Sequence, residues 1–407
     1  DWTEPEYFTP ANKDASDAVL AAGNAGRVTA LWLDNSGNDP TVWSTTFDGT
    51  SWLPSVAVTP NEGRYANLAL VADSTGLFTA VWDNGTTCSI ESSRSTDGQT
   101  WTTPVPVTTD LDRCPWEPKI VVDDSGRLTA IWNADDGQVT QYIVVEASTS
   151  TTPGSWGPVE VLSTVGEDAR ESTLVTTADG LALAAWTSNQ GTGPAIKSRS
   201  SQSGATWSPL ESHGGESDVS PSLSAGPSGT VLLSWAAGVD GSDGLLVRSS
   251  NDGVSWTAPV RISPEGDQVL DRARLSEDSC GQFVALWMAT DEAQSTFFIH
   301  SSTSVNGVDW SSPVNLDSAA DLSMFPRIVE DASGRVTAVW VSLNGATVLL
   351  QTSTMTKPVC ASSPAAPVLA NTGADVARIT TTLAVSVGLL AVGAVMVATL
   401  RRRRTIR

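Results

Sequence analysis

Short stretches of alternating apolar and polar residues follow one another along most of the chain, separated by turns that contain glycine. They are rich in β-branched residues, as β-strands are. In the third unit the pattern predicts an inner strand over 118–123, a second over 128–132, a third over about 140–148 and an outer strand over 156–162. Four short antiparallel strands in each unit are typical of a propeller blade.

Tryptophan marks the period of this pattern. One tryptophan closes the second strand of each unit, at intervals of about 50 residues: Trp32, Trp82, Trp132, Trp186, Trp235, Trp287 and Trp340. A second set follows about 20 residues later: Trp52, Trp101, Trp156, Trp207, Trp256 and Trp310. A fixed period of this length indicates a solenoid or a propeller. We therefore predict an all-β fold, a seven-bladed β-propeller over residues 1–359.

The seventh unit lacks a second tryptophan after Trp340. Residues 1–5, Asp-Trp-Thr-Glu-Pro, repeat the outer-strand pattern of residues 309–313, Asp-Trp-Ser-Ser-Pro. The N-terminal strand is therefore predicted to complete the last blade and close the ring, which removes exposed sheet edges.

The turn before each second tryptophan resembles the Asp-box, the bacterial neuraminidase repeat Ser-x-Asp-x-Gly-x-Thr-Trp. The nearest match covers residues 249–256, with Asn251 at the aspartate position. In three units an aspartate stands one place later: Asp48, Asp97 and Asp252. The resemblance covers residues 1 to about 357 and implies a sialidase-like propeller. In that family the motif lies away from the ligand face, so it implies nothing about catalysis.

The C-terminal region has a different pattern. Residues 379–400 carry no charge and are numerous enough to cross a bilayer core of about 30 Å as a helix. Five arginines follow within 401–407, and basic residues mark the cytoplasmic side of a membrane helix. We therefore predict a transmembrane helix over 379–400 and a cytoplasmic tail over 401–407.

A pentapeptide stands just before this apolar run: Leu369, Ala370, Asn371, Thr372 and Gly373. It resembles the sorting motif of Gram-positive surface proteins, in the Leu-Ala-x-Thr-Gly form that looks actinobacterial. The resemblance implies that sortase cleaves after Thr372 and joins its carboxyl to peptidoglycan, with residues 360–368 as a linker. The expected location is the cell wall of a Gram-positive bacterium. An ordinary single-span membrane anchor is the alternative.

The net charge restricts the possible binding partners, and the cysteines predict disulfides. The formal net charge of −22 repels nucleic acid and favours cations and basic partners. Four cysteines in an exported chain suggest disulfides rather than free thiols. Cys88 and Cys114 fall on the same face of neighbouring blades, as do Cys280 and Cys360. We therefore predict the pairs Cys88–Cys114 and Cys280–Cys360.

Propellers usually bind ligands on the face with the longer, more varied loops. Trp116 and Arg113 lie in one of these loops, where an aromatic ring beside charges suits a sugar ring or a peptide side chain. The alternative is that Trp116 packs against the Cys88–Cys114 bridge. Tyr65, Arg64 and Arg327 also fall in interblade loops or at the starts of inner strands. These five residues form the predicted ligand site.

Oxygen-rich loops on the same face raise the question of calcium. Asp34 and Asp39 flank the best local candidate for Ca²⁺, although the segment completes no known calcium loop. A solvated acidic rim is the alternative, and no cofactor is required.

The sialidase likeness also offers an enzyme as an alternative. Sialidases have six blades, whereas seven are counted here, and residues 326–328 read Pro-Arg-Ile rather than the family's Arg-Ile-Pro. For a triad hydrolase, His213 and His300 are the only candidate bases. We therefore expect a non-catalytic binding or adhesion module for a glycan or protein. A sialidase-like exo-glycosidase and a structural surface protein are the alternatives.

Overall fold

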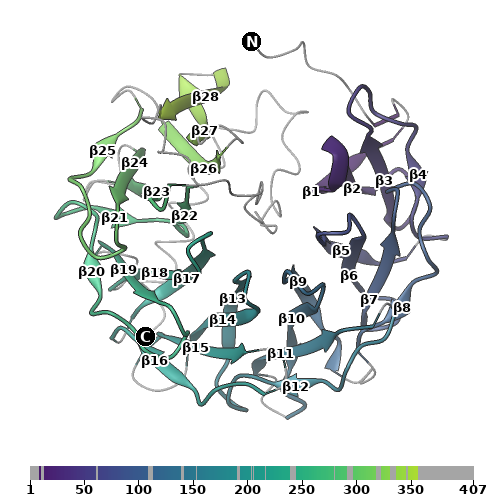
Figure 1. Cartoon of the computed structure of the whole chain (residues 1–407), viewed down its shortest axis with the longest axis horizontal. Coiled ribbons are helices and arrows are strands. Elements are labelled where there is room, and N and C mark those ends of the chain that lie inside the picture. The colour runs from purple at the N-terminus through teal and green to yellow at the C-terminus, as the bar shows by residue number, and fades with distance from the viewer. Residues whose placement is uncertain are drawn as a thin grey trace.

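The computed structural model describes residues 9–10, 13–60, 63–108, 113–138, 142–152, 154–189, 193–202, 204, 206–215, 217–238, 244–278, 280–290, 297–317, 322–330, 336–344 and 347–355. Over these residues the chain forms seven antiparallel β-sheets, which stand side by side around a central axis (Figure 1). The architecture is an all-β propeller, as the repeat of the inner tryptophan predicts.

The first three blades each contain four strands in chain order. Blade 1 comprises β1 (Ala15–Ala22), β2 (Val28–Asp34), β3 (Thr41–Phe47) and β4 (Val56–Ala57), with a short 3-10 helix, η1 (Asn24–Gly26), after β1. Blade 2 comprises β5 (Tyr65–Ala72), β6 (Phe78–Asn84), β7 (Ser89–Ser95) and β8 (Val105–Pro106). Blade 3 comprises β9 (Trp116–Val122), β10 (Leu128–Asp135), β11 (Ile143–Ser150) and β12 (Glu160–Val161).

The next three blades follow the same plan. Blade 4 comprises β13 (Ala169–Thr176), β14 (Leu181–Ser188), β15 (Ala195–Gln202) and β16 (Glu211–His213). Blade 5 comprises β17 (Val219–Ala225), β18 (Val231–Ala237), β19 (Gly244–Ser250) and β20 (Val260–Arg261). Blade 6 comprises β21 (Gln268–Val269), β22 (Arg274–Glu277), β23 (Phe283–Thr290), β24 (Phe297–Ser304) and β25 (Val314–Asn315). Both β21 and β22 pair with β23, so they are two pieces of one inner strand.

Blade 7 has three strands over the described residues, β26 (Leu322–Glu330), β27 (Val336–Asn344) and β28 (Thr347–Met355). The strand predicted to complete it, over residues 1–5, lies outside the described residues. Closure of the ring by the N-terminus therefore stays a prediction.

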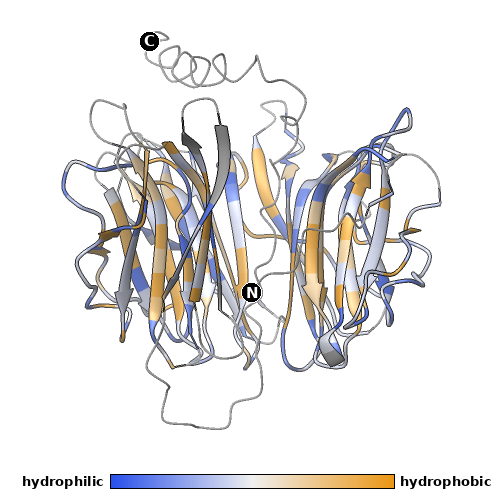
Figure 2. Ribbon diagram, turned by 90° about the horizontal axis from the view of Figure 1, so that it is seen from above, coloured by the Kyte–Doolittle hydropathy of each residue, from blue (hydrophilic) through white to orange (hydrophobic). Residues whose placement is uncertain are grey.

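The inner tryptophans form the core between blades. Six of them have no exposed surface, and Trp340 is 2% exposed. Trp132 of blade 3 belongs to one apolar cluster with Val81 and Ile90 of blade 2, and Trp186 of blade 4 packs with Val145 of blade 3. Figure 2 shows apolar stretches along the strands, where neighbouring sheets face each other. Burial of these rings supplies the main driving force for stacking the blades.

The predicted outer strand over 156–162 is wrong in extent. The structure has only β12 (Glu160–Val161) there, and Trp156 lies before it with its Nε1 donating to Ser92 Oγ of blade 2 at 2.8 Å. Pro158 lacks an N–H and cannot join a strand ladder, so regular pairing begins after it. Such short outer strands also limit edge-to-edge association.

The turn that resembles the Asp-box uses a different pair of residues from the sequence match. Ser250 Oγ accepts from the N–H of Gly253 at 2.9 Å, and Asp252 Oδ1 accepts two backbone N–H groups. The bonded pair is therefore Ser250 and Asp252, one place after Ser249 and Asn251. The same bonding pattern recurs around Ser95 and Asp97, and around Ser304 and Asn306.

The predicted C-terminal elements lie outside the part of the chain that the structure describes. They are the linker over 360–368, the sorting motif over 369–373, the transmembrane helix over 379–400 and the tail over 401–407. Within the described ranges, no helix is long and apolar enough to cross a membrane.

Candidate functional site beside the central axis

Six inner strands contain one residue with a left-handed backbone. These residues stand at the same distance before the inner tryptophan of their blade: Asp17, Asn67, Glu117, Glu171, Ser220 and Phe325, with φ from 51° to 58°. Each lies at a shift in the pairing register of its inner strand, a β-bulge. A non-glycine residue in such a conformation costs about 1–3 kcal/mol, and such residues cluster at ligand sites.

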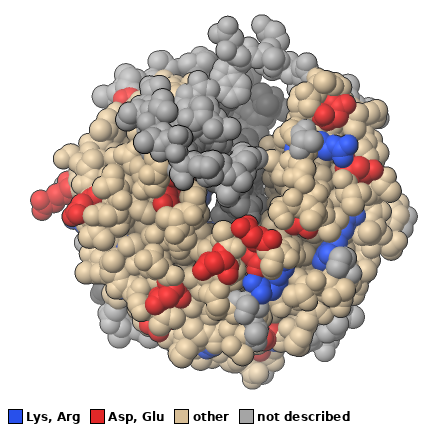
Figure 3. Space-filling model, in the orientation of Figure 1, with Lys and Arg blue, Asp and Glu red and all other residues tan. Residues whose placement is uncertain are grey.

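We refer to Asp17, Asn67, Glu117, Glu171 and Ser220 as the polar ring. They belong to β1, β5, β9, β13 and β17, the innermost strands of the first five blades, so they surround the central axis (Figure 1). Figure 3 shows acidic side chains gathered beside the centre of one face. The bulges therefore place polar groups where seven blades converge.

Asp83 of β6 joins blades 2 and 3 at this ring. Its side chain is 8% exposed, and burial raises the pKa of its carboxyl to about 6. The Asn67 amide and the Glu117 backbone N–H donate hydrogen bonds to this carboxylate and partly oppose the shift, while the negative charge of Glu117 adds to it. Asp83 of one blade thus satisfies the strained backbone of the next.

A carboxylate also accepts the backbone N–H of the next blade's bulge residue between blades 4 and 5. Glu171 Oε2 accepts from the backbone N–H of Ser220 and from Thr187 Oγ1, each at 2.9 Å. From blade 6, Arg272 donates from Nη1 to the carbonyl of Ser172, the residue after Glu171, at 3.4 Å. Glu171 therefore joins blades 4 and 5, as Asp83 joins blades 2 and 3.

The blade 2–3 part of the site retains unused acceptors. Asn133 Nδ2 donates to Glu117 Oε2 at 3.1 Å, but Asn133 Oδ1 and Asp83 Oδ1 are buried and have no hydrogen-bond partner. Buried acceptors without a donor are costly to stability, so these two oxygens are strained parts of the junction between blades 2 and 3. Among the described residues, no three Asp, Glu, His or Cys side chains gather as a metal site would require.

The structure brings two predicted ligand residues to this site. Trp116 is the first residue of β9, adjacent to Glu117, and pairs across the ladder with Asn133. It is half-buried and belongs to a strand, not to the loop expected from the sequence. Arg113 lies nearby but is already bonded, because Nη1 pairs with Glu146 Oε1 at 2.6 Å and Nε donates to the Asp135 carbonyl at 2.6 Å.

The other predicted ligand residues belong to blades 2 and 7, and Tyr65 begins β5, the strand that contains Asn67. The Tyr65 ring packs edge-on against Trp82 at 6.4 Å between centroids, and burial, with the nearby Glu91 charge, raises the pKa of its hydroxyl. Arg64 is exposed beside it. Arg327 lies in β26 of blade 7, where Nη1 donates to the Pro326 carbonyl at 3.0 Å. Four of the five predicted residues therefore belong to blades 2 and 3, and Arg327 belongs to blade 7; a shared ligand site stays a prediction.

Sequence reasoning missed Asn67, Asp83 and Asn133. One signal was available, because Asp83 and Asn133 directly follow an inner tryptophan, where blade 1 carries the apolar Leu33. The left-handed backbone of the bulges, by contrast, had no signature in the sequence.

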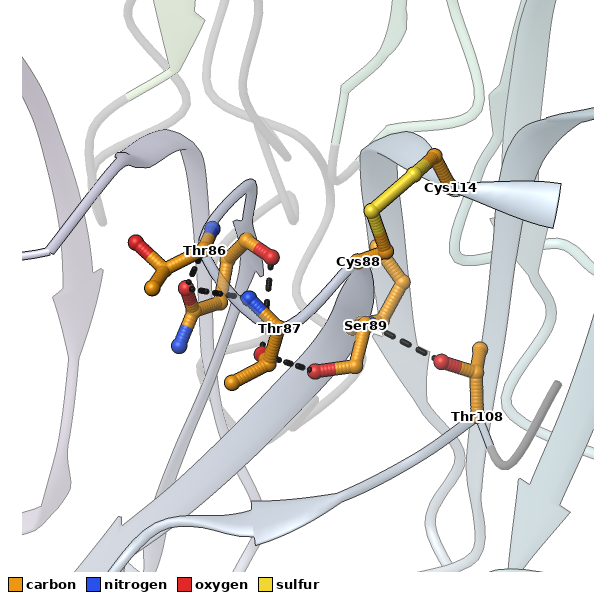
Figure 4. The surroundings of a disulfide bond; sticks show 8 residues. Thr86, Thr87, Cys88, Ser89, Thr108 and Cys114 are labelled. Carbon is orange, nitrogen blue, oxygen red and sulfur yellow. Dashed lines mark hydrogen bonds between the residues drawn. A yellow bond between two sulfur atoms is a disulfide. The ribbon is translucent and has the colours of Figure 1, made fainter. Parts of the chain in front are cut away.

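A disulfide fixes the approach to Trp116. Cys88 and Cys114 are bonded, with their Cα atoms 4.2 Å apart, and this is the first of the two pairs predicted from the sequence (Figure 4). The bridge ties the loop before β7 to the segment that leads into β9. Cys280 is also in a disulfide, and Cys360, its predicted partner, lies outside the described residues.

The predicted calcium loop contains a carboxylate that is already neutralised. Asp34 is buried and accepts from Lys13 Nζ at 2.6 Å and from Ser36 Oγ at 2.6 Å. The same ammonium lies 4.3 Å from the centre of a Trp43 ring, while Asp39 is exposed. Calcium at this loop stays a prediction.

A serine–histidine pair on blade 4 has the wrong proton arrangement for a hydrolase. His213 Nε2 lies 2.7 Å from Ser198 Oγ, and its Nδ1 lies 3.1 Å from Arg248 Nη1. Arginine can only donate, so Nδ1 accepts and Nε2 carries the ring proton. Burial, together with the charges of Arg248 and Lys197, lowers the pKa of His213 to about 3. His213 therefore cannot remove a proton from Ser198.

Lowering the pH is expected to change the free energy of unfolding in opposite directions through His213 and Asp83. The unfolded chain binds more protons at His213 between pH 6.5 and about 3, so lowering the pH from 7 to 5 removes about 2 kcal/mol of stability. At Asp83 the folded chain binds more protons between about pH 6 and 3.8. The same change from pH 7 to 5 therefore adds about 1.4 kcal/mol of stability through Asp83. His213→Gln should therefore lose less stability than the wild type over this interval, and Asp83→Asn should lose more. Urea denaturation at pH 7 and pH 5 measures this, and equal pH dependence in all three proteins would contradict it.

Comparison with known proteins gives no family. No family model matches the chain, and no curated protein matches it. Similar solved structures include a Hadza microbial sialidase, at 15% identity over 80% of this chain and 76% of the other, with a TM-score of 0.44. A leech intramolecular trans-sialidase has 11% identity over 87% and 70% of the two chains, with a TM-score of 0.46. A Penicillium chrysogenum α-L-arabinanase has 16% identity over 56% and 77%, with a TM-score of 0.40. Likenesses of this size assign no activity to this chain.

Proposed function

We propose that the chain is a binding propeller displayed on a bacterial cell wall, with a glycan or protein ligand held beside the central axis. The polar ring is the observation that supports this proposal. Five blades keep a strained polar residue at one equivalent position, and Asp83 Oδ1 and Asn133 Oδ1 beside it lack donors. The Glu117 carboxylate beside them is exposed, and a hydroxyl-rich or cationic ligand would donate hydrogen bonds to it.

Several contacts favour binding over sialidase-like hydrolysis. A sialidase grips its substrate carboxylate with converging arginines, but here Arg113 pairs with Glu146 and Arg170 with Asp168, in separate blades. The only tyrosine predicted at the site, Tyr65, has a raised pKa and packs on Trp82, so its hydroxyl is a poor nucleophile. The acidic surroundings of the axis also disfavour an anionic sugar there (Figure 3).

Attachment to the wall is the second part of the proposal. It is supported by the sequence alone, through the order of the sorting motif over 369–373, the apolar run over 379–400 and the arginines that follow. Sortase and peptidoglycan are the partners that this arrangement implies.

One experiment separates the three functions. The purified chain is assayed on a fluorogenic sialoside and on arrays of glycans and matrix proteins, with and without calcium. Specific binding without turnover supports the proposal. Turnover of the sialoside would contradict the proposal and favour a sialidase-like exo-glycosidase. Neither turnover nor binding would favour a structural surface protein.

Trp116→Ala is expected to weaken binding of the array ligand about fivefold. Stacking of an aromatic ring on a ligand contributes about 1 kcal/mol, and a tenfold change would need about 1.4 kcal/mol. Trp116 is half-buried, so the circular dichroism spectrum should not change. Trp52→Ala, in the turn between β3 and β4, removes an equal ring on the opposite face and serves as the control. Equal affinity of Trp116→Ala and the wild type would remove Trp116 from the site.

A further inference from the structure

Arg94 departs from the repeat of the propeller. On the third strand of every blade, one residue pairs with the position three before the inner tryptophan. In six blades this residue carries a hydroxyl: Thr46, Thr149, Ser200, Ser249, Thr303 and Thr354. In blade 2 it is Arg94, opposite Thr79. The fold therefore needs only a hydroxyl at this position.

The Arg94 guanidinium is buried without an ionic partner. The side chain is 8% exposed, Nη2 donates to Ser150 Oγ at 3.1 Å, and Nε has no hydrogen-bond partner. None of the ion pairs among the described residues includes it. Burial lowers the pKa of the guanidinium, and the charge of Asp73 only partly opposes this. An unpaired buried cation destabilises a protein unless something else compensates it.

Asp73 does not fill that role. Its Oδ1 accepts from the backbone of Thr75 and Leu77 and from the Thr75 hydroxyl. The Asp73 charge acts on Arg94, but the two side chains form no ion pair among those of the described residues. Arg199 and Arg248 also appear in none of the ion pairs among the described residues, so Arg94 is distinguished by its position in the repeat and not by the missing ion pair alone.

Arg94 lines a groove between blades 2 and 3. The groove has a volume of about 320 Å³, within the range of small-molecule sites. Seven of its lining residues are serine or threonine, although the surface that the wall presents is mostly apolar. Four of the seven are exposed: Thr96, Thr100, Thr102 and Thr103. Residues of the turns before β8 and β12 line it, so it opens on the turn face, away from the polar ring.

A second groove supplies an internal comparison. It lies between blades 6 and 7, has a volume of about 360 Å³, and carries Thr303 at the position of Arg94. Its wall contains apolar and hydroxyl residues but no charged one. A groove between blades therefore does not itself require an arginine.

We propose that the groove between blades 2 and 3 binds an oxyanion on a hydroxyl-rich ligand, such as the carboxylate of an acidic sugar. The Arg94 guanidinium holds the anionic oxygens, and the threonine hydroxyls bond the hydroxyls of the ligand. This site is independent of the one beside the central axis. It also explains why blade 2 retains a charge that six blades omit.

Thermal unfolding of the purified chain tests the proposal. Sodium glucuronate, sodium sulfate and glucose are compared with sodium chloride at equal ionic strength. Glucuronate should raise the Tm of the wild type by about 2–4 °C, as expected for binding to the folded state alone. Arg94→Thr, which installs the residue type of the other blades, should abolish this rise. Without anion it should be at least as stable as the wild type, because a buried unpaired charge is gone.

Two further variants complete the test. Thr103→Trp blocks the groove without altering the guanidinium and should also abolish the rise. Arg27→Thr removes an exposed arginine from the turn after β1 and should keep it. A rise with glucuronate but not sulfate assigns a sugar acid. Sulfate also stabilises proteins by exclusion from their surface, so a general oxyanion is assigned only if Arg94→Thr loses part of the rise with sulfate. An equal rise with glucose, an equal rise in Arg94→Thr, or no rise in the wild type would overturn the proposal.

Discussion

Trp132→Ala is expected to lower the free energy of unfolding by about 3–5 kcal/mol, the range for removing a buried tryptophan. Trp132 has no exposed surface and packs against Val81 and Ile90 of blade 2, so alanine leaves a cavity between two blades. The indole Nε1 also donates to Glu146 Oε2 at 2.8 Å. Urea denaturation measures the loss, and a loss below about 1.5 kcal/mol would show that neighbouring side chains collapse into the space.

Phenylalanine separates the cavity from the hydrogen bond. Trp132→Phe keeps most of the ring volume but removes the donor to Glu146, a buried carboxylate. Trp32 is the matched control, because its Nε1 has no hydrogen-bond partner. Trp132→Phe should therefore cost about 1–3 kcal/mol more than Trp32→Phe, as for a bond to a charged group. Equal losses in the two variants would mean that the Glu146 bond contributes nothing to stability.

Thr372→Ala is expected to abolish covalent attachment to the cell wall. The resemblance to the sorting motif implies that the Thr372 carboxyl is transferred to a peptidoglycan amine, and sortase would no longer recognise the altered motif. The apolar run over 379–400 and its arginines would then hold the unprocessed chain in the membrane.

Fractionation of cells distinguishes the two states. A muramidase should release the wild type with attached wall fragments, whereas the variant should require detergent. Asn371→Ala changes the variable position of the motif and should leave wall attachment intact. If muramidase releases Thr372→Ala as it does the wild type, the motif is not the attachment point.

Much of the fold was predictable because it repeats. The inner tryptophans recur at a fixed period, and each is buried between neighbouring blades as the pattern indicates. The ends of the outer strands were not predictable from alternation, because Pro158 and its counterparts delay regular pairing after the second tryptophan. The Asp-box match was displaced by one residue for a related reason. Adjacent serines at 249 and 250 look alike in sequence, and only the turn geometry selects Ser250.

The sequence alone was less informative about the candidate site. It singled out Trp116 and Arg113, which do lie close to the blade 2–3 part of the polar ring. It gave no indication that Arg113 is paired with Glu146, because the two residues belong to different segments of blade 3. Arg327 looked equivalent to them by position, but lies in blade 7.

The sequence by itself determined the all-β class, the number of units and the placement of one tryptophan in each core, because periodic burial leaves a periodic pattern. The tertiary structure alone decided which acids meet across blades, where the backbone becomes left-handed and that Arg94 is buried without an ionic partner. Those properties depend on contacts between residues of different blades. Local alternation of apolar and polar residues reports which face of a strand is buried, but it carries no information about the charge of the neighbouring blade.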